Sequence, residues 1–65
     1  MAINYTLRPV KLSKDRAAKL IADLQRNSIT GTQRHEEHTT TVTIHETRDN
    51  RGAVADLIEY HTKFI

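Results

Sequence analysis

The clearest pattern of hydrophobic and polar positions lies in residues 39–47, which read TTTVTIHET. Side chains alternate between the two faces of a strand, so this segment separates into two sets. One face carries Thr40, Val42, Ile44 and Glu46. The other face carries Thr39, Thr41, Thr43, His45 and Thr47. The pattern predicts a strand with one face apolar at its centre and a nearly continuous row of threonines on the other.

Residues 2–10 show the same alternation and predict a second strand. Ile3, Tyr5 and Leu7 fall on one face, which we expect to be buried. The polar side chains between them are expected to face solvent. Because Pro9 has no N–H to donate, the strand is expected to lie at a sheet edge or to end there.

Residues 14–26 predict an amphipathic helix. The apolar positions repeat at helical spacing: Ala17, Leu20, Ile21 and Leu24. Ser13 is a suitable N-cap residue, and Asn27 tolerates the left-handed geometry that often ends a helix. We therefore expect the helix to begin after Ser13 and to end at Asn27.

Residues 28–38, SITGTQRHEEH, carry the weakest pattern. A short, irregular strand is favoured, pairing with residues 39–47 as a hairpin around Glu36 and Glu37. Gly31 would weaken such a strand or mark a bulge. The alternative is a mobile loop of about ten residues.

A second helix is predicted over residues 51–64, after a turn at residues 48–52. Asp49 or Asn50 is the expected cap. One apolar stripe comprises Val54, Leu57, Ile58, His61 and Ile65. An adjoining stripe comprises Ala53, Leu57, Tyr60 and Phe64. The apolar residues Phe64 and Ile65 are expected to be docked.

The order strand, helix, weak strand, strand, helix predicts a single α+β domain over residues 1–65. A small, mostly antiparallel sheet with both helices on one face would bury the apolar stripes. The chain has 65 residues and no cysteine, so neither a disulfide nor a thiolate metal site can stabilise it. A core this small supplies little stability, which favours a homodimer.

Charge and hydropathy indicate the cellular location expected for the protein. The net charge is +2, with the basic excess in residues 1–34 and an acidic excess in residues 35–65. The N-terminal residues do not resemble a signal peptide, and no apolar run reaches the ~20 residues of a membrane span. A cytoplasmic protein with no membrane partner is expected.

The sequence gives little indication of a catalytic or metal-binding site. His35, His38 and His45 lie near three glutamates, but HEEH lacks the spacing of the HExxH zinc motif. A solvated hairpin tip is the favoured interpretation, with a His/Glu metal site as the weakest reading. The only serines are Ser13 and Ser28, and there is no glycine-rich phosphate loop. With little room for a pocket of about 300 Å³, we expect no enzyme, no metal and no cofactor.

Two functional classes remain. The preferred class is a small non-enzymatic interaction or regulatory module that binds a protein partner or a second copy. The expected contact surface is the threonine face, which comprises Thr39, Thr41, Thr43, His45 and Thr47. If this strand lay at an edge, it could pair with the same strand of another copy. The alternative is a nucleic-acid-binding module that uses a basic corner: Arg8, Lys11, Lys14, Arg16 and Lys19. Poor aromatic stacking argues against it, because Tyr5 is expected to face inward.

Overall fold

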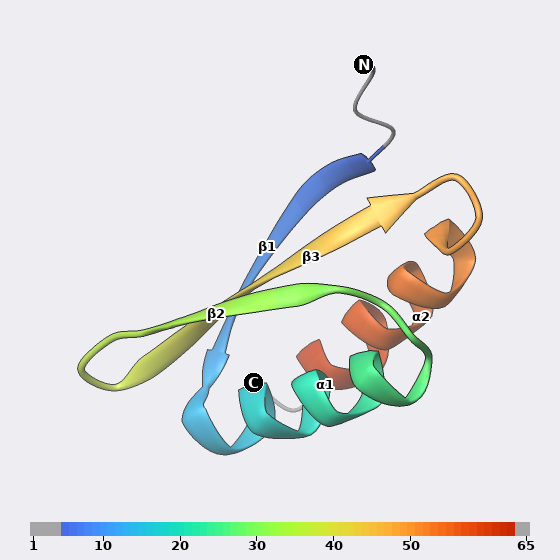
Figure 1. Cartoon of the computed structure of the whole chain (residues 1–65). Coiled ribbons are helices and arrows are strands. Elements are labelled where there is room, and N and C mark those ends of the chain that lie inside the picture. Colours follow the sequence, from blue (N-terminus) through green and yellow to red (C-terminus); the bar gives the residue numbers. More distant parts are fainter. Residues whose placement is uncertain (1–4, 64–65) are drawn as a thin grey trace.

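The computed structural model describes residues 5–63, which form a three-stranded sheet and two helices (Figure 1). The elements in chain order are β1 (Tyr5–Ser13), α1 (Lys14–Arg26), β2 (Gly31–His35), β3 (Thr39–Thr47) and α2 (Arg51–Thr62). The sheet order is β1-β3-β2, and β3 runs antiparallel to both neighbours. β1 and β2 are therefore parallel, and α1 connects them in a split βαβ unit. The predicted α+β class is confirmed.

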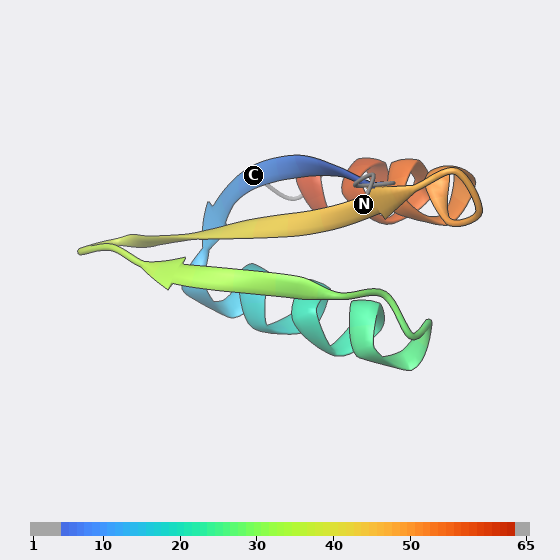
Figure 2. The same cartoon turned by 45° about the horizontal axis from the view of Figure 1, so that its top comes forward.

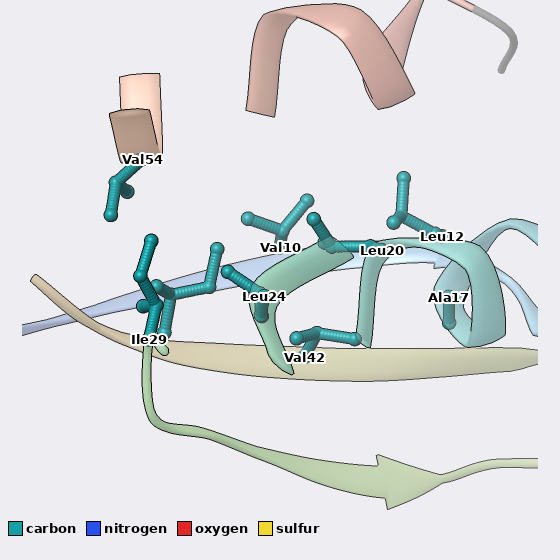
Figure 3. Close-up of a cluster of buried hydrophobic side chains, with 9 residues drawn as sticks. Val10, Leu12, Ala17, Leu20, Leu24, Ile29, Val42 and Val54 are labelled. Carbon is teal, nitrogen blue, oxygen red and sulfur yellow. The ribbon is translucent and has the colours of Figure 1, made fainter. Parts of the chain in front are cut away.

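The core lies between the sheet and the two helices (Figure 3). Its buried hydrophobic residues are Val10, Leu12, Ala17, Leu20, Leu24, Ile29, Val42, Ile44 and Val54. On β3 the burial follows the predicted alternation, since positions 40, 42, 44 and 46 are buried and the threonines between them are half-buried. Both helices contribute to this one core, so they lie on the same face of the sheet (Figures 1 and 2).

β1 buries the opposite face from the one predicted. Tyr5 and Leu7 are 43% and 53% exposed, whereas Val10 and Leu12 are 8% and 2% exposed. The strand does not end at Pro9 but continues to Ser13, and its C-terminal half lies over the helices. Side chains alternate between the two faces of a strand. Because Val10 and Leu12 are buried on one face, Tyr5 and Leu7 lie on the other face and point outward. The predicted edge position is confirmed, and Ile3 lies outside the described residues.

α1 has the predicted bounds because both of its ends carry local signals. The Ser13 hydroxyl accepts a hydrogen bond from the backbone N–H of Arg16 at 3.3 Å. At the other end Asn27 is the C-cap, but Ser28 is the residue that adopts the left-handed conformation, with φ of 58°. The N–H of Ile29 then donates to the carbonyl of Leu24 at 2.8 Å, as in a Schellman motif, and brings Ile29 into the core.

Residues 31–35 form a strand, so the predicted hairpin with β3 is confirmed and the loop alternative is wrong. The turn lies at residues 36–38. Gly31 lies against α1: a Cβ at this position would come within 3.0 Å of the Leu24 Cδ1 atom. The glycine therefore allows the helix to approach β2 closely.

α2 ends at Thr62 instead of residue 64. Asn50 occupies the N-cap position, but its side chain binds back to the preceding strand. It accepts from the Thr47 N–H at 2.7 Å and donates to the His45 carbonyl at 3.2 Å. Val54 and His61 are buried, while Ala53 and Tyr60, from the second predicted stripe, are exposed. The prediction that Phe64 and Ile65 dock concerns residues outside the described range.

Neither of the two helices described within residues 5–63 has the length and apolar character needed to span a membrane.

Candidate interaction surface

β3 occupies the middle of the sheet, so the edge position considered for it is wrong. Its backbone pairs with β1 over nine residues and with β2 over five. With hydrogen-bonding partners on both sides, β3 cannot also pair with the same strand of a second copy. Only its side chains can contact a partner, and the free edges of the sheet belong to β1 and β2.

The sheet face that points away from the helices forms a continuous surface, here called the open face. Within residues 5–63 the strand register places twelve residues on it: Tyr5, Leu7, Pro9, Lys11 and Ser13 of β1, Thr32 and Arg34 of β2, and Thr39, Thr41, Thr43, His45 and Thr47 of β3. Within residues 5–63 no helix covers this face. The structure thus brings together all five residues of the predicted threonine face and adds flanking residues that the sequence pattern did not assign to it.

An aromatic pair lies toward one end of the open face. The Tyr5 ring stacks on the His45 imidazole, with 4.8 Å between the ring centroids and 4° between the planes. Leu7 lies directly across from His45 in the register. Sequence reasoning missed this pair because it placed Tyr5 inward. The signal that could have corrected the placement of Tyr5 is the pair of apolar residues Val10 and Leu12, which lie on the other face of the same strand.

The hairpin end of the open face is ordered by Glu36. Its carboxylate accepts hydrogen bonds from the hydroxyls of Thr39 at 3.3 Å and Thr41 at 3.2 Å. The Lys11 ammonium reaches across β3 to within 3.5 Å of the same oxygen. The Thr41 hydrogen bond, followed by the Lys11 charge, lowers the pKa of Glu36 below its ordinary value of 4.5. These contacts favour the ionised form of Glu36, which links all three strands at this end.

The basic corner predicted from the sequence does not form one surface. Arg8 lies on the helix-facing side of β1 and pairs with Glu46 at 3.1 Å, while Lys11 pairs with Glu36 on the open face. Lys14, Arg16 and Lys19 are on α1. Two of the five cations are thus engaged by carboxylates on different faces of the sheet, and the remaining three follow a helix.

A groove between α1 and α2 collects some of these cations. It has a volume of about 430 Å³. Its lining comprises Arg16, Lys19, Ala22, Asp23, Arg26, Tyr60 and His61. Among the described residues of this lining, Asp23 is the one with a carboxylate side chain; it pairs with Arg26 at 3.3 Å and with His61 at 2.7 Å. Sequence reasoning identified Arg16 and Lys19 but not Arg26 or the exposed Tyr60 ring.

The histidines do not converge. The Nδ1 atom of His35 is 2.9 Å from the hydroxyl of buried Thr40, His38 lies 3.6 Å from Glu37 in the hairpin turn, and His45 stacks on Tyr5. No group of three metal-ligating side chains occurs within residues 5–63. His61, which the sequence pattern placed on an apolar stripe of the second helix, is buried, and its Nδ1 atom has no hydrogen-bond partner in this part of the chain.

The molecule is more hollowed than its length suggested. A cleft of about 770 Å³ opens at the Tyr5 end of the sheet, where β3 turns into α2. Its lining is mostly polar and charged: Tyr5, Thr6, Glu46, Thr47, Arg48, Asp49 and Arg51. The expectation that such a short chain has little room for a pocket of about 300 Å³ is therefore wrong.

Comparisons with protein-family models, with curated proteins and with solved structures found no match to this chain.

Proposed function

We propose that the protein is a small non-enzymatic interaction module that binds a protein partner through the open face and self-associates as a homodimer. The observation that carries this proposal is the one-sided architecture. Both helices pack on one face of the sheet, and the opposite face leaves Leu7 and Tyr5 about half exposed. A bare sheet face with large apolar side chains is a frequent site of protein association.

The chemistry of the open face suits a protein partner. It combines an aromatic pair, an exposed leucine and an arginine with a central row of threonine hydroxyls. Aromatic and arginine side chains are enriched in protein interfaces, whereas the hydroxyls can donate to and accept from a partner's backbone. The row is also rigid, because β3 is hydrogen-bonded on both sides. Little conformational freedom would be lost there on binding.

Self-association follows from the small core. Within residues 5–63 nine buried hydrophobic residues form the core, and a chain without cysteine has no disulfide to reinforce them. Domains of this size often gain the missing stability from oligomerisation. A homodimer would bury further surface without lengthening the chain.

The open face is tested by affinity capture from a lysate of the source cells, using as bait either the wild type or a Leu7→Glu, Thr43→Lys double variant. We expect the double variant to lose the protein partner retained by the wild type. Burying two charged side chains in the interface would make the free energy of binding less favourable by several kcal/mol. Ala53→Lys, on the exposed side of α2, is the control and should retain the partner. Equal capture by all three proteins, each shown to be folded by circular dichroism, would refute the assignment of the open face.

A second candidate function is binding of a single-stranded nucleic acid. The observation that favours it is the groove between α1 and α2, where Arg16, Lys19 and Arg26 lie beside the exposed ring of Tyr60. Cations that contact phosphates and an aromatic ring that stacks on a base are the usual means of binding single strands. Salt-dependent binding to a single-stranded oligonucleotide tests this candidate function.

A further inference from the structure

The two free edges of the sheet differ in how well they are protected. β1 contains Pro9, which lacks an N–H, and a proline is one of the devices that prevent an edge strand from pairing further. β2, Gly31–His35, contains neither proline nor lysine. Its residues from Thr32 to His35 are all exposed. β2 is therefore the edge that is open to another strand.

The register identifies the backbone groups that β2 presents to solvent. The N–H of Glu36 donates to the Thr39 carbonyl at 2.8 Å, and the N–H of His45 donates to the Thr30 carbonyl at 2.9 Å. In an antiparallel pair the direction of the backbone groups alternates from one residue to the next. Even-numbered residues of β2 thus bond to β3. Gly31, Gln33 and His35 direct their N–H and C=O groups outward, where no backbone partner exists within residues 5–63.

We propose that two copies of the protein pair antiparallel through β2, about a two-fold axis at Gln33, and so extend the sheet across the dimer. This proposal rests on the self-association included in the proposed function. Gln33 of one copy would exchange two backbone hydrogen bonds with Gln33 of the other, and Gly31 would do the same with His35. Three residue pairs supply about six backbone hydrogen bonds. The interaction that sequence reasoning assigned to residues 39–47 is thereby moved to the neighbouring strand.

The side chains of β2 tolerate this self-pairing. On the open face, Arg34 would lie directly opposite Thr32 of the second copy, so identical charges do not face each other across the pair. On the helix side, the residues at the axis are neutral glutamines. The strand is therefore compatible with a copy of itself without requiring a charged partner of different sequence.

The flank of α1 next to β2 supports the same two-fold arrangement. α1 runs alongside β2 (Figure 2), and Ile21 Cδ1 is 4.0 Å from the position that a Gly31 Cβ would take. At 100° per residue, Ala18 and Gln25 lie on this same flank as Ile21. The charged residues Arg16, Lys19, Asp23 and Arg26 lie on the opposite flank, along the groove with α2.

The centre of the β2-side flank is thus small, apolar or neutral, and it adjoins the unprotected strand. Pairing of β2 with β2 would bring the two copies of α1 together over this uncharged centre, where Ala18 permits a close approach. Lys14, at the N-terminal end of the same flank, would lie away from the axis. On the helix side, the edge of β2 at Gln33 and the adjacent flank of α1 are both uncharged near the axis, and on the open face the two copies of Arg34 would be diagonal to each other, not directly opposed. This arrangement points to a second copy as the occupant.

Amide hydrogen exchange measured by NMR tests the strand pairing directly. In a monomer, the amide protons of Gln33 and His35 have no acceptor and exchange quickly, whereas those of Thr32 and Arg34 are protected by β3. We expect protection at Gln33 and His35 to rise at least about tenfold as the protein concentration is raised through the dimer dissociation constant. Fast exchange of these two amides in a sample that is dimeric by sedimentation would overturn the proposal.

Sedimentation equilibrium of matched variants provides the second test. Gln33→Pro removes an outward N–H without removing a bond to β3, and Ala18→Lys places like charges near the axis. We expect each to raise the dimer dissociation constant at least about tenfold. Ala22→Lys, the same change on the groove side of α1, should leave it unchanged. If Gln33→Pro fails to fold, Ala18→Lys, its control Ala22→Lys and the exchange experiment still test pairing through β2.

The outcomes separate this proposal from the proposed function. A wild-type dimer that neither Gln33→Pro nor Ala18→Lys weakens would overturn pairing through β2 and leave self-association standing. A wild-type monomer at concentrations up to about 1 mM would overturn both β2 pairing and self-association. Neither result alters the capture experiment, which tests the open face with different residues.

Discussion

Glu36 shows at the scale of one residue how the hairpin turn is held to the sheet. It receives hydroxyl hydrogen bonds from β3 and a cation from β1, and its pKa is lowered as a result. Sequence reasoning placed the hairpin turn correctly but treated its side chains as solvated. Lys11 is 25 positions from Glu36 in the sequence, and only the strand register brings the two together.

The lowered pKa of Glu36 predicts the direction in which stability changes with pH. Because the folded-state pKa lies below the unfolded one, the associated stability is present above the unfolded value and is lost as pH falls through the folded value. In Thr41→Val, which removes the largest cause of the shift, the pKa should rise toward 4.5. Carboxyl-carbon NMR titration measures it. Thr43→Val, one step along the same face, is the control; equal shifts in both variants would contradict the role of the Thr41 hydroxyl.

His61 marks a limit of residue-by-residue reasoning. Its place on an apolar helical stripe correctly indicated contact with the core, but not that it would be 1% exposed. Its Nε2 atom lies 2.7 Å from Asp23, 38 positions away on α1. The helix pattern of either segment could place each residue on a face, yet the pairing depends on how the two helices cross, which no local pattern encodes.

Among the secondary-structure elements, those with local end signals were predicted best. α1 begins after Ser13 and ends at Arg26 as expected, because its caps are encoded by neighbouring residues. β1 was predicted as a strand with the wrong face inward. Both phases of β1 carry apolar side chains, and the choice between them depends on which half of the strand lies over the helices. That is decided by tertiary packing, not by alternation.

The inverted face of β1 can be checked by two substitutions of the same kind. Leu12→Ala should lower the free energy of unfolding by about 2–5 kcal/mol, because Leu12 is buried in the core. Leu7→Ala should cost less than about 1 kcal/mol, since Leu7 is half exposed. Urea unfolding at one fixed protein concentration gives both values. A larger cost for Leu7→Ala would mean that the open face is the buried one, in agreement with the sequence pattern and against the structure.

At the scale of the whole molecule, the placement of both helices on one face was predicted, but the strand order was not. The best-patterned strand, β3, was considered as an edge and proved to be central. Strand order depends on pairings between segments far apart in the chain, and the alternation within a strand carries no information about it. The consequence is that the threonine row offers only side chains to a partner, and the proposed backbone pairing falls to β2.

The distribution of charge over the whole molecule leads to a prediction for the nucleic-acid alternative. The predicted basic corner is divided, because Arg8 and Lys11 are paired with glutamates on different faces of the sheet. The binding would fall to three cations of the α1–α2 groove, of which Arg26 would exchange its ion pair with Asp23 for a phosphate. Each phosphate contact contributes about −0.7 to the slope of log affinity against log salt for a single strand. We therefore expect a slope of about −2 by fluorescence anisotropy with a single-stranded oligonucleotide if this alternative is correct.

Two lysines of α1 separate a specific groove from general attraction to a basic protein. Lys19→Glu, in the groove, should weaken oligonucleotide binding by at least about tenfold, because it replaces a phosphate contact with a repulsive charge. Lys14→Glu makes the same change in net charge on the opposite flank of the helix and should have a much smaller effect. Equal losses would indicate binding driven by net charge alone. No salt-dependent binding by the wild type would eliminate the nucleic-acid alternative and leave the open face and the β2 edge as the proposed interaction surfaces.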